Sequence, residues 1–429
     1  MKNISTEELY KIFLEHPVVS TDTRNTPDKS LFFALKGANF NANEFAAEAI
    51  KKGCAYAIID DEKFYSDKCI LVPDVLKALQ NLANYHRKQF TIPVIGITGS
   101  NGKTTTKELT AAVLSKKYST LFTQGNLNNH IGVPLTLLKL TKEHGMAVIE
   151  MGANHVGEID MLCRIAEPDY GIITNIGKAH LEGFGGYEGV IKAKSELYKC
   201  IKEKNGELFV NADDELLIKL SDGVYFTYGV SRDADIRGFL DKDSFLAKGT
   251  IEMIDGEDIQ VSSQLAGSYN FYNILAAACI GYYFEVTPEE IKQAIEDYIP
   301  SNNRSQIEKK GSNTIWVDAY NANPSSMKTA IENFAAQNTP NKVLILGDMF
   351  ELGEESQKEH QAIADLIEKN NWGAVYLIGK EFSKAKSSGK SFIALDDFIK
   401  WLAEHPLKDT TILLKGSRGM QMERVLETL

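Results

Sequence analysis

A turn rich in glycine, lysine and threonine is the first feature of the sequence that could carry out chemistry. Residues 94–105 read VIGITGSNGKTT. The usual phosphate-binding template, G-x-x-x-x-G-K-[ST], requires its first glycine at position 97, where this chain has Ile97. The glycines are instead Gly96, Gly99 and Gly102. The stretch is therefore either a nucleotide site with altered spacing or an ordinary glycine-rich turn.

The sequence on either side of the turn favours the nucleotide site. An apolar run before it predicts a strand, and the apolar spacing after it predicts a helix, so backbone N–H groups and the positive helix end converge on an anion. Gly99 and Gly102 lack a Cβ and let phosphate oxygens approach the backbone. Lys103 can reach the β- and γ-phosphates, and the Thr104 hydroxyl can ligate Mg²⁺. The predicted ATP-binding residues of the turn are Thr98, Gly99, Ser100, Asn101, Gly102, Lys103, Thr104 and Thr105.

Composition limits the class of protein. The 429 residues carry a net charge of -11, which argues against broad binding to nucleic acid or to anionic membranes. The chain has no run of eighteen apolar residues, and residues 1–16 have the pattern of a charged amphipathic helix rather than of a signal peptide. Five cysteines without C-x-x-C spacing indicate reduced thiols. We expect a cytoplasmic protein with no nucleic-acid partner and no membrane insertion.

The order of apolar runs divides the chain into three segments. Residues 1–91 alternate short strands with helical stretches, and residues 91–93 (TIP) interrupt the helical periodicity. Residues 92–301 contain continuous apolar strands, which are typical of a parallel sheet covered on both faces. The polar residues 300–313 indicate a second junction, and residues 302–429 alternate strand and helix. We predict an α/β protein of three domains, with a central P-loop parallel-sheet domain and a C-terminal doubly wound (Rossmann-like) domain.

Three further side chains could gather beside the turn. Glu150 ends a predicted strand, where a carboxylate suits Mg²⁺, although a solvated strand-end glutamate is the alternative. His180 follows another predicted strand, and by itself such a histidine is more often structural than a ligand. Lys194 lies in a helical pattern, where a lysine is normally a surface charge. The residue pattern leaves these alternatives open.

Seven motifs occur in an order that is characteristic of one protein family. They are GITGSNGKTTTKE, GNLNNHIGVPLTLL, VIEMGANHVGEI, TNIGKAHLEGFG, AKSELY, DAYNANPSSM and KGSRGMQME. With them the chain resembles the Mur ligases over nearly its whole length, including STDTRNTPDKSLFFALKGANFNANEF near its start. The asparagine-rich second and sixth motifs resemble the branch of the family that adds a dipeptide.

The resemblance implies an ATP-dependent amide ligase of peptidoglycan precursor synthesis. The peptide carboxylate of UDP-N-acetylmuramoyl-tripeptide would attack the γ-phosphate of ATP, giving an acyl phosphate and ADP. The amine of D-alanyl-D-alanine would then attack the acyl carbon and release phosphate. Because a carboxylate is a poor electrophile, phosphorylation supplies the leaving group, and the enzyme must position anions and neutralise their charge. The expected enzyme is a monomer.

The resemblance also implies a role for each segment and for the side chains beside the turn. Residues 1–91 would bind the UDP precursor, residues 92–301 would bind ATP, and residues 302–429 would close over ATP and bind the dipeptide. The family places His180 on a second Mg²⁺. The lysine that matches Lys194 is carbamylated in several members, which turns an ammonium into an anion with metal-binding oxygens. The implied catalytic residues are Lys103, Glu150, His180 and Lys194, and the implied metal ligands are Thr104, Glu150, His180 and Lys194.

Other binding residues are implied by matching motifs. For the nucleotide they are Asn270, Asn273, Arg304 and Asp318. The usual histidine before Asn270 is replaced by Tyr269, and Asn270 and Asn273 could also be simple helix-start residues. For the UDP precursor, the peptide and the dipeptide they are Thr23, Arg24, Lys36, Gly37, Asn128, Asn129, Tyr320, Asn321, Asn323 and Arg418.

Two other functions remain compatible with parts of the pattern. One is a related ligase that adds a single amino acid to the muramyl peptide, or glutamate to folate. The UDP-type N-terminal segment argues against folate, and the asparagine-rich motifs argue against single-residue addition. The other function, of a different class, is a P-loop ATPase whose turnover drives a binding event without ligation. A ligase would release phosphate only when the acceptor amine is present.

Overall fold

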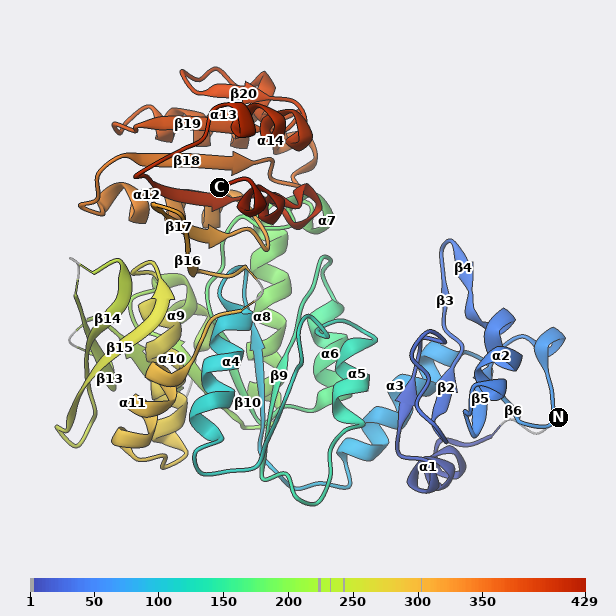
Figure 1. The fold of residues 1–429 in the computed structure, drawn as a ribbon. Coiled ribbons are helices and arrows are strands. Elements are labelled where there is room, and N and C mark those ends of the chain that lie inside the picture. Colours follow the sequence, from blue (N-terminus) through green and yellow to red (C-terminus); the bar gives the residue numbers. More distant parts are fainter. Residues whose placement is uncertain (1–3, 223–224, 232, 242–243, 302) are drawn as a thin grey trace.

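The chain folds into three α/β parts, each built around its own sheet (Figure 1). The computed structural model describes residues 4–222, 225–231, 233–241, 244–301 and 303–429. The C-terminal sheet lies directly above the central part, and the N-terminal part lies to one side of it (Figure 1). This is the predicted three-domain α/β architecture.

The N-terminal part contains a small parallel sheet with the strand order β1-β2-β5-β6. Its first helix begins with a capping box, in which the Ser5 side chain accepts from the Glu8 amide and the Glu8 carboxylate accepts from the Ser5 amide. The hairpin of β3 and β4 projects from this part (Figure 1). The elements are α1 (Thr6–Glu15), β1 (Val19–Ser20), β2 (Leu31–Phe33), β3 (Lys36–Gly37), β4 (Phe40–Asn41), η1 (Ala42–Phe45), α2 (Ala46–Lys51), β5 (Tyr56–Ile59), η2 (Glu62–Phe64) and β6 (Cys69–Leu71).

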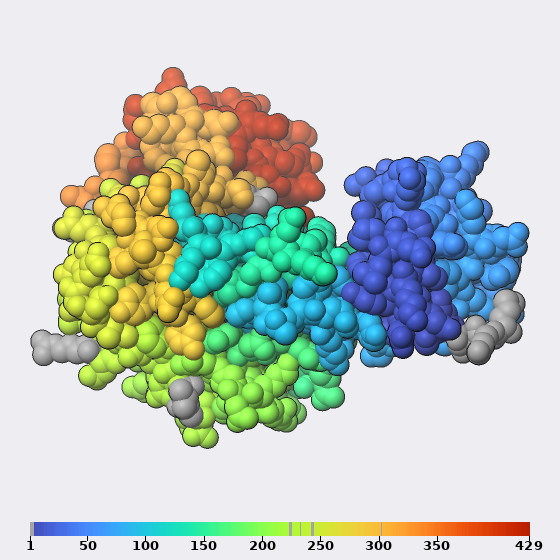
Figure 2. Space-filling model, turned by 90° about the horizontal axis from the view of Figure 1, so that it is seen from below, coloured from blue at the N-terminus to red at the C-terminus, as the bar shows by residue number. Residues whose placement is uncertain are grey.

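Helix α3 (Val75–Arg87) connects the N-terminal and central parts. It packs against α1 on one side and against α5 (Gly132–Leu137) and α6 (Glu158–Ala166) on the other. The helix ends at Arg87, ahead of the predicted interruption at residues 91–93, where Pro93 disfavours helical geometry at Ile92. Figure 2 shows an open space between the N-terminal part and the C-terminal part, so the attachment runs through the central part.

The central part is organised around a nine-stranded sheet with the order β15-β14-β13-β12-β11-β10-β7-β9-β8. Every residue of β7 and β9 is buried, as expected for strands covered on both faces. The strands are β7 (Val94–Thr98), β8 (Thr120–Phe122), β9 (Met146–Glu150), β10 (Tyr170–Ile173), β11 (Glu207–Asn211), β12 (Tyr225–Gly229), β13 (Ile236–Leu240), β14 (Leu246–Glu252) and β15 (Asp258–Ala266). The helices besides α5 and α6 are α4 (Lys103–Leu114), α7 (Leu181–Phe184), α8 (Tyr187–Glu203), α9 (Glu215–Ser221), α10 (Asn270–Tyr283) and α11 (Pro288–Asp297).

One edge of the central sheet differs from the predicted parallel arrangement. The strands from β8 to β13 in the sheet order, which include β7, pair parallel with one another, whereas β14 pairs antiparallel with both β13 and β15. In β15 exposed and buried residues alternate, because one face of this edge is solvated. The P-loop strand β7 lies in the parallel region, so the difference does not affect the site.

The C-terminal part has a six-stranded sheet with the order β16-β17-β21-β18-β19-β20. All neighbours are parallel except β16 and β17. The elements are β16 (Gln306–Lys310), β17 (Asn313–Asp318), α12 (Pro324–Ala336), β18 (Lys342–Gly347), η3 (Gly353–Glu355), α13 (Ser356–Ile367), β19 (Ala374–Ile378), η4 (Phe382–Lys384), β20 (Lys390–Phe392), α14 (Leu395–Glu404), β21 (Thr411–Lys415), η5 (Arg418–Met420) and η6 (Met422–Glu427).

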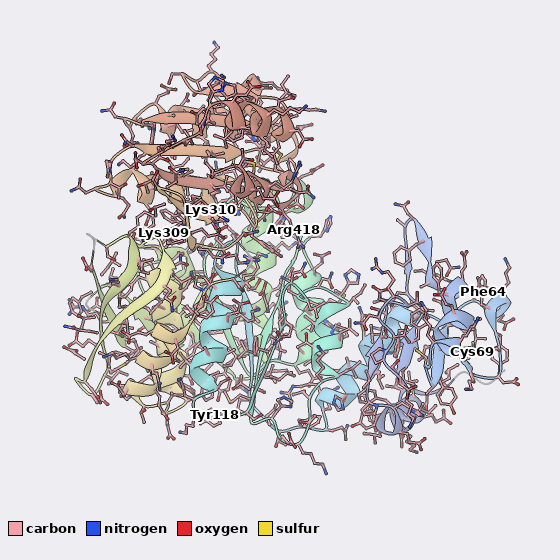
Figure 3. The ribbon with its side chains drawn as sticks, viewed as in Figure 1. Phe64, Cys69, Tyr118, Lys309, Lys310 and Arg418 are labelled. Atoms are coloured by element: carbon pink, nitrogen blue, oxygen red, sulfur yellow. The ribbon has the colours of Figure 1, made fainter. Side chains whose placement is uncertain are left out.

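The expectation that residues 300–313 form only a junction was wrong for its second half. Residues 306–310 form β16, whose partner is β17, and Lys309 and Lys310 lie on this strand beside the central part (Figure 3). The polar side chains misled the prediction because an edge strand exposes much of its surface to water.

Candidate active site

The predicted strand, turn and helix of the phosphate-loop motif are present. Strand β7 ends at Thr98, and α4 begins at Lys103. Gly99 and Gly102 both have positive φ angles, 147° and 80°. A Cβ on Gly99 would lie 2.0 Å from Thr174 Oγ1, and one on Gly102 would lie 2.6 Å from Asn273 Oδ1. Glycine is therefore required at both positions, by conformation and by space.

A neighbouring loop holds the turn in place. The backbone amide of Ser100 donates to the carbonyl of Asn175 at 2.9 Å, and the amide of Asn101 donates to the Asn175 side chain at 3.1 Å. The Thr174 hydroxyl donates to the Asn101 carbonyl at 2.6 Å. Sequence reasoning did not select Thr174 or Asn175, and their position at the end of the adjacent strand β10 was the available signal.

The side chain of Lys103 folds back over the turn. Its Nζ donates to the carbonyl of Gly99 at 2.8 Å and to that of Ser100 at 3.4 Å. Burial lowers the pKa of Lys103, the Glu150 charge opposes that shift, and the Arg304 charge adds to it. The ammonium group therefore lies in a poorly solvated place where an anion would be a favourable partner.

Glu150 ends β9 next to the P-loop strand and is buried, so the alternative of a solvated glutamate is wrong. Its Oε2 accepts from the Thr104 hydroxyl at 3.0 Å, and its Oε1 accepts from the Asn128 side-chain amide at 2.7 Å. Asn128 was predicted to bind substrate, and in the structure its amide holds Glu150. Asn129 instead caps the turn before α5, accepting from the amides of Ile131 and Gly132.

The donor set around Glu150 fits a magnesium ion. Within the part of the chain that the structure describes, no three His, Cys, Asp or Glu side chains gather into a metal-holding group. Mg²⁺ in nucleotide enzymes takes one or two carboxylates and completes its shell with phosphate oxygens and water. The Glu150 carboxylate and the Thr104 hydroxyl are such hard oxygen donors, and they are in direct contact.

His180 and Lys194 occupy unusual environments. His180 precedes α7 with a φ of 51°, and its Nδ1 forms an ion-pair contact with the Glu351 carboxylate. Lys194 is buried in α8, with its Nζ 5.4 Å from the centre of the Phe184 ring, so the alternative of a surface lysine is wrong. Burial, with a contribution from Lys103, lowers the pKa of Lys194 to about 7.

The asparagines of α10 form a buried network on the other side of the turn. The Asn273 amide donates to Asn270 Oδ1 at 2.8 Å, and Asn273 Oδ1 accepts from the Thr106 hydroxyl at 3.1 Å. Asn270 donates to Ser305 Oγ at 3.0 Å. The residue before the first turn of α10 is Tyr269, and its side chain makes no capping bond. The two asparagines therefore join α10 to the P-loop helix and to the C-terminal part rather than capping their own helix.

Tyr269 adds an aromatic wall to the same region. Its hydroxyl is 3.0 Å from Ser305 Oγ, and its ring stacks on Trp316 with 16° between the planes. Tyr269 also lines the cavity described below. Sequence reasoning noted the substitution at this position, but not the stack, since Trp316 lies 47 residues further along the chain.

The C-terminal part contributes loops that follow β17 and β21. The Asn323 amide donates to Asn101 Oδ1 at 2.8 Å, which ties the start of α12 to the P-loop. The Arg304 guanidinium lies 3.4 Å from the centre of the Tyr320 ring. Asp318 pairs with Lys415 at 2.6 Å, and both side chains are largely buried. Lys415 was not among the predicted site residues, although it ends a strand.

These groups surround one cavity of about 700 Å³ between the central and C-terminal parts. Seventeen of the predicted residues line it: Ser100, Asn101, Gly102, Lys103, Thr104, Thr105, Asn128, Asn129, Glu150, His180, Asn270, Asn273, Arg304, Asp318, Tyr320, Asn321 and Asn323. Thr98 and Gly99 directly precede the lining residue Ser100 in the chain, whereas Lys194 is not among the residues that line the cavity. Arg418 is at the edge of the C-terminal part, where its guanidinium donates to the Tyr320 hydroxyl at 3.2 Å (Figure 3).

The four predicted UDP-binding residues are not at this cavity. They lie in the N-terminal part, with Lys36 and Gly37 on the projecting hairpin (Figure 1). Arg24 is exposed and pairs with Asp22 at 2.7 Å, and Lys36 pairs with Asp60 at 2.9 Å. The carbonyl of Thr23 accepts from Lys52. The predicted sites thus form two separate groups, one in the N-terminal part and one between the other two parts.

The state of the cysteines and the apolar character of the helices are two further properties of the chain. All five cysteines are free thiols. Among the helices that the described residues form, none has the length and apolar character needed to cross a membrane.

Comparisons with known proteins agree with this architecture. Residues 97–281 match the model of the Mur ligase middle domain, and residues 303–418 match that of the Mur ligase, glutamate ligase domain. The chain is 36% identical over 428 residues to the UDP-N-acetylmuramoyl-tripeptide–D-alanyl-D-alanine ligase of Bacillus subtilis, covering 96% of this chain and 92% of that protein. The protein of the same name from Escherichia coli is 37% identical over 426 residues, covering 96% and 93%. The MurF ligase of Thermotoga maritima in complex with ADP superimposes with a TM-score of 0.85 at 29% identity, covering 96% of each chain.

Proposed function

The chain belongs to the Mur ligase family, and we infer that it joins D-alanyl-D-alanine to UDP-N-acetylmuramoyl-tripeptide with ATP, in the synthesis of peptidoglycan precursors. The relatives that carry this name match along nearly the whole chain. The observation that carries the proposal is the shared cavity, where the P-loop faces Asp318, Tyr320 and Asn323 of the C-terminal part. Phosphate transfer and amide formation require all reacting groups at one such place.

We propose that the P-loop binds the phosphates of ATP through residues 98–105. The amides at the start of α4 and the Lys103 ammonium would hold the β- and γ-phosphates, since that end of a helix attracts anions. Lys103 now contacts two carbonyls of its own loop and would exchange these contacts for phosphate oxygens. Its partial desolvation strengthens that attraction. Asn270, Asn273 and Arg304 would contact the nucleotide beyond the phosphates, and Asp318 would accept from a ribose hydroxyl.

The chemistry then proceeds in two displacements. An oxygen of the tripeptide carboxylate attacks the γ-phosphorus, and the bond to the bridging oxygen breaks to release ADP. The free amine of D-alanyl-D-alanine next attacks the acyl carbon, phosphate leaves, and the amine loses a proton. Lys103 and the loop amides stabilise the negative charge that accumulates on the transferred phosphoryl group. We place the dipeptide among Tyr320, Asn321, Asn323 and Arg418.

We further propose that Glu150, Thr104, His180 and Lys194 hold two Mg²⁺ ions. A bound divalent cation would neutralise the charge of the phosphate oxygens. The Glu150–Thr104 contact supports one position, and Asn128 keeps the carboxylate of Glu150 oriented. Lys194 would serve as a ligand only as a carbamate. Its burial supports that conversion, because an amine with a lowered pKa is more often neutral and CO₂ reacts with the neutral form.

We assign one domain to each substrate. Residues 1–91 would bind the UDP precursor through Thr23, Arg24, Lys36 and Gly37, residues 92–301 would bind ATP, and residues 302–429 would cover ATP and bind the dipeptide. We propose that the enzyme acts as a monomer. The free thiols support a reducing compartment, so we place the reaction in the cytoplasm.

The decisive experiment measures phosphate release with each substrate omitted in turn. The proposal predicts release with ATP, UDP-N-acetylmuramoyl-tripeptide and D-alanyl-D-alanine together, and almost none when the dipeptide is absent. Replacing the dipeptide with D-alanine alone tests the single-residue ligases. Release of phosphate from ATP without the peptide substrate or the dipeptide would support the non-ligating ATPase and contradict the proposal.

A further inference from the structure

Two residues in left-handed backbone conformation face each other across the junction of the central and C-terminal parts. His180, at the start of α7, has a φ of 51°, and Glu351, in the loop after β18, has a φ of 61°. Non-glycine residues rarely adopt this conformation, and it persists only where surrounding structure holds it. The pair therefore marks a place where both loops are constrained to bring two side chains together.

The two loops contact each other through both side chains and backbone. His180 Nδ1 meets the Glu351 carboxylate, and the amide of Glu182 donates to the Glu351 carbonyl at 3.3 Å. A Cβ built on Gly353 would lie 3.3 Å from Glu182 Cβ, so the backbones are close. The T-shaped contact with Phe184 supports the His180 ring from its own side.

We propose that Glu351 is a positioning residue that orients His180 for a divalent cation, an inference that rests on the metal site of the proposed function. A carboxylate on one imidazole nitrogen fixes the tautomer and the ring orientation, so that the other nitrogen carries its lone pair toward a metal. Here Glu351 contacts Nδ1 of His180, so Nε2 is the nitrogen whose lone pair would bind the cation. His180 lines the cavity together with Thr104 and Glu150, where the cation would lie.

The contact between His180 and Glu351 joins two different domains. His180 belongs to the central domain, whereas Glu351 belongs to the C-terminal domain. The histidine is therefore oriented only while the C-terminal domain is docked, and cation binding and docking stabilise each other, since binding and conformational equilibria are linked. An enzyme of this design assembles its cation site fully only when the domain that covers the nucleotide is in place.

A purely structural ion pair is the competing explanation. The Glu351 side chain is 55% exposed, and ion pairs with that exposure contribute little to docking. A second cross-domain pair, between Lys178 Nζ and Glu359 Oε1 at 2.6 Å, is buried at its Glu359 end and does not involve His180. The two pairs can therefore be separated by mutation.

The test is a titration of the ADP complex with Mn²⁺, followed by electron paramagnetic resonance, for the wild type and five variants. Glu351→Gln should weaken the affinity of one class of Mn²⁺ site by about ten- to a hundredfold, the usual effect of removing such a partner. His180→Ala should weaken the same class, and adding Glu351→Gln to it should cause no further loss. Glu359→Gln, which breaks the other cross-domain pair, should weaken Mn²⁺ binding much less than Glu351→Gln does. Glu354→Gln, an exposed neighbour, should bind Mn²⁺ as the wild type does.

Each alternative result has a definite meaning. If His180→Ala leaves Mn²⁺ binding unchanged, the metal assignment of His180 fails, and the inference fails with it. If His180→Ala weakens binding but Glu351→Gln does not, the metal assignment stands and Glu351 is only a docking contact. If Glu359→Gln weakens binding as strongly as Glu351→Gln, the effect comes from domain docking, and the positioning role is overturned.

Discussion

Lys415 and Asp318 form a buried ion pair at the ends of two neighbouring parallel strands, with 2.6 Å between Nζ and Oδ2. The same ammonium donates to the carbonyl of Asn321 at 3.1 Å. One cation thus holds the proposed ribose acceptor and the loop proposed for the dipeptide. Breaking such a pair leaves a buried charge without its partner, which is costlier than replacing both members.

We predict that Lys415→Met lowers the preference for ATP over 2′-deoxy- and 3′-deoxy-ATP by about tenfold, since a hydrogen bond to a charged group contributes about 1.5–3 kcal/mol. The KM for ATP should rise more than kcat falls, because Asp318 loses its fixed position. The measurement is steady-state kinetics with the three nucleotides. Asp318→Asn should lose the same preference, and full retention in both variants would contradict the ribose assignment.

We predict that Lys103→Ala lowers kcat by about a hundred- to a thousandfold, the usual cost of removing one group that stabilises transition-state charge. The fold should be retained, since Lys103 Nζ donates its hydrogen bonds to the carbonyls of Gly99 and Ser100 in its own loop. Phosphate-release kinetics and circular dichroism are the measurements. The control is Lys142→Ala, because Lys142 is exposed on the surface. Lys107→Ala would not serve, because Lys107 is fully buried. A Lys103→Ala enzyme with more than about a tenth of wild-type turnover would contradict the phosphate role.

We predict that Lys194→Ala nearly abolishes turnover while ADP binding persists. An ammonium buried beside a divalent cation would be repelled, so an active enzyme requires a neutral or an anionic side chain at this position. Carbon-13 NMR with labelled bicarbonate should show a carbamate signal in the wild type that is absent from Lys194→Ala. Isothermal titration with ADP checks the integrity of the nucleotide site. Wild-type protein that is fully active without any carbamate signal would exclude the modification.

We predict that stability at the junction of the N-terminal and central parts decreases as the pH falls below about 6.5, the usual pKa of histidine. Burial lowers the pKa of His86, whose Nδ1 lies 3.2 Å from the Tyr10 hydroxyl and whose Nε2 lies 3.0 Å from the Leu140 carbonyl. His86 therefore binds a proton more readily in the unfolded chain than in the folded chain. The free energy of unfolding is retained above about pH 6.5 and decreases as the pH falls below that value.

The measurement for this prediction is the urea midpoint of the wild type and of His86→Gln at several values between pH 5 and pH 8. The wild type should lose stability more steeply than the variant on acidification. Since the other seven histidines are common to both proteins, the difference isolates His86. Parallel curves would show that its titration does not contribute.

We predict that the N-terminal domain moves toward the cavity when the UDP-peptide and an ATP analogue are both bound. The proposed UDP-binding residues and the cavity form separate groups, and open space separates the N-terminal part from the C-terminal part (Figure 2). One substrate must bridge them, and domain closure is the usual solution. Small-angle scattering should show a smaller radius of gyration with both ligands than with either alone. An unchanged radius at saturation would mean that the peptide reaches the cavity without closure.

Local pattern was sufficient for much of the fold. The apolar run of β7, the glycines and the helical spacing after Lys103 are neighbours in the chain, and their structure depends mainly on their own sequence. The ends of β9 and β17 were predicted for the same reason, but only Glu150 was selected from its strand-end position, whereas Asp318 was assigned from the family resemblance. The antiparallel edge and β16 were missed, because strand direction depends on partners and not on the strand itself.

By itself, the sequence determined the three α/β domains, the phosphate loop and many of the residues that line the cavity. Only the tertiary structure decided which of them meet. The Asn128 amide holds Glu150, Lys415 holds Asp318, and Glu351 holds His180. The two members of each pair are separated by 22, 97 and 171 residues in the chain. Such contacts depend on sheet register and on the docking of one domain against another, so no local pattern of residues specifies them.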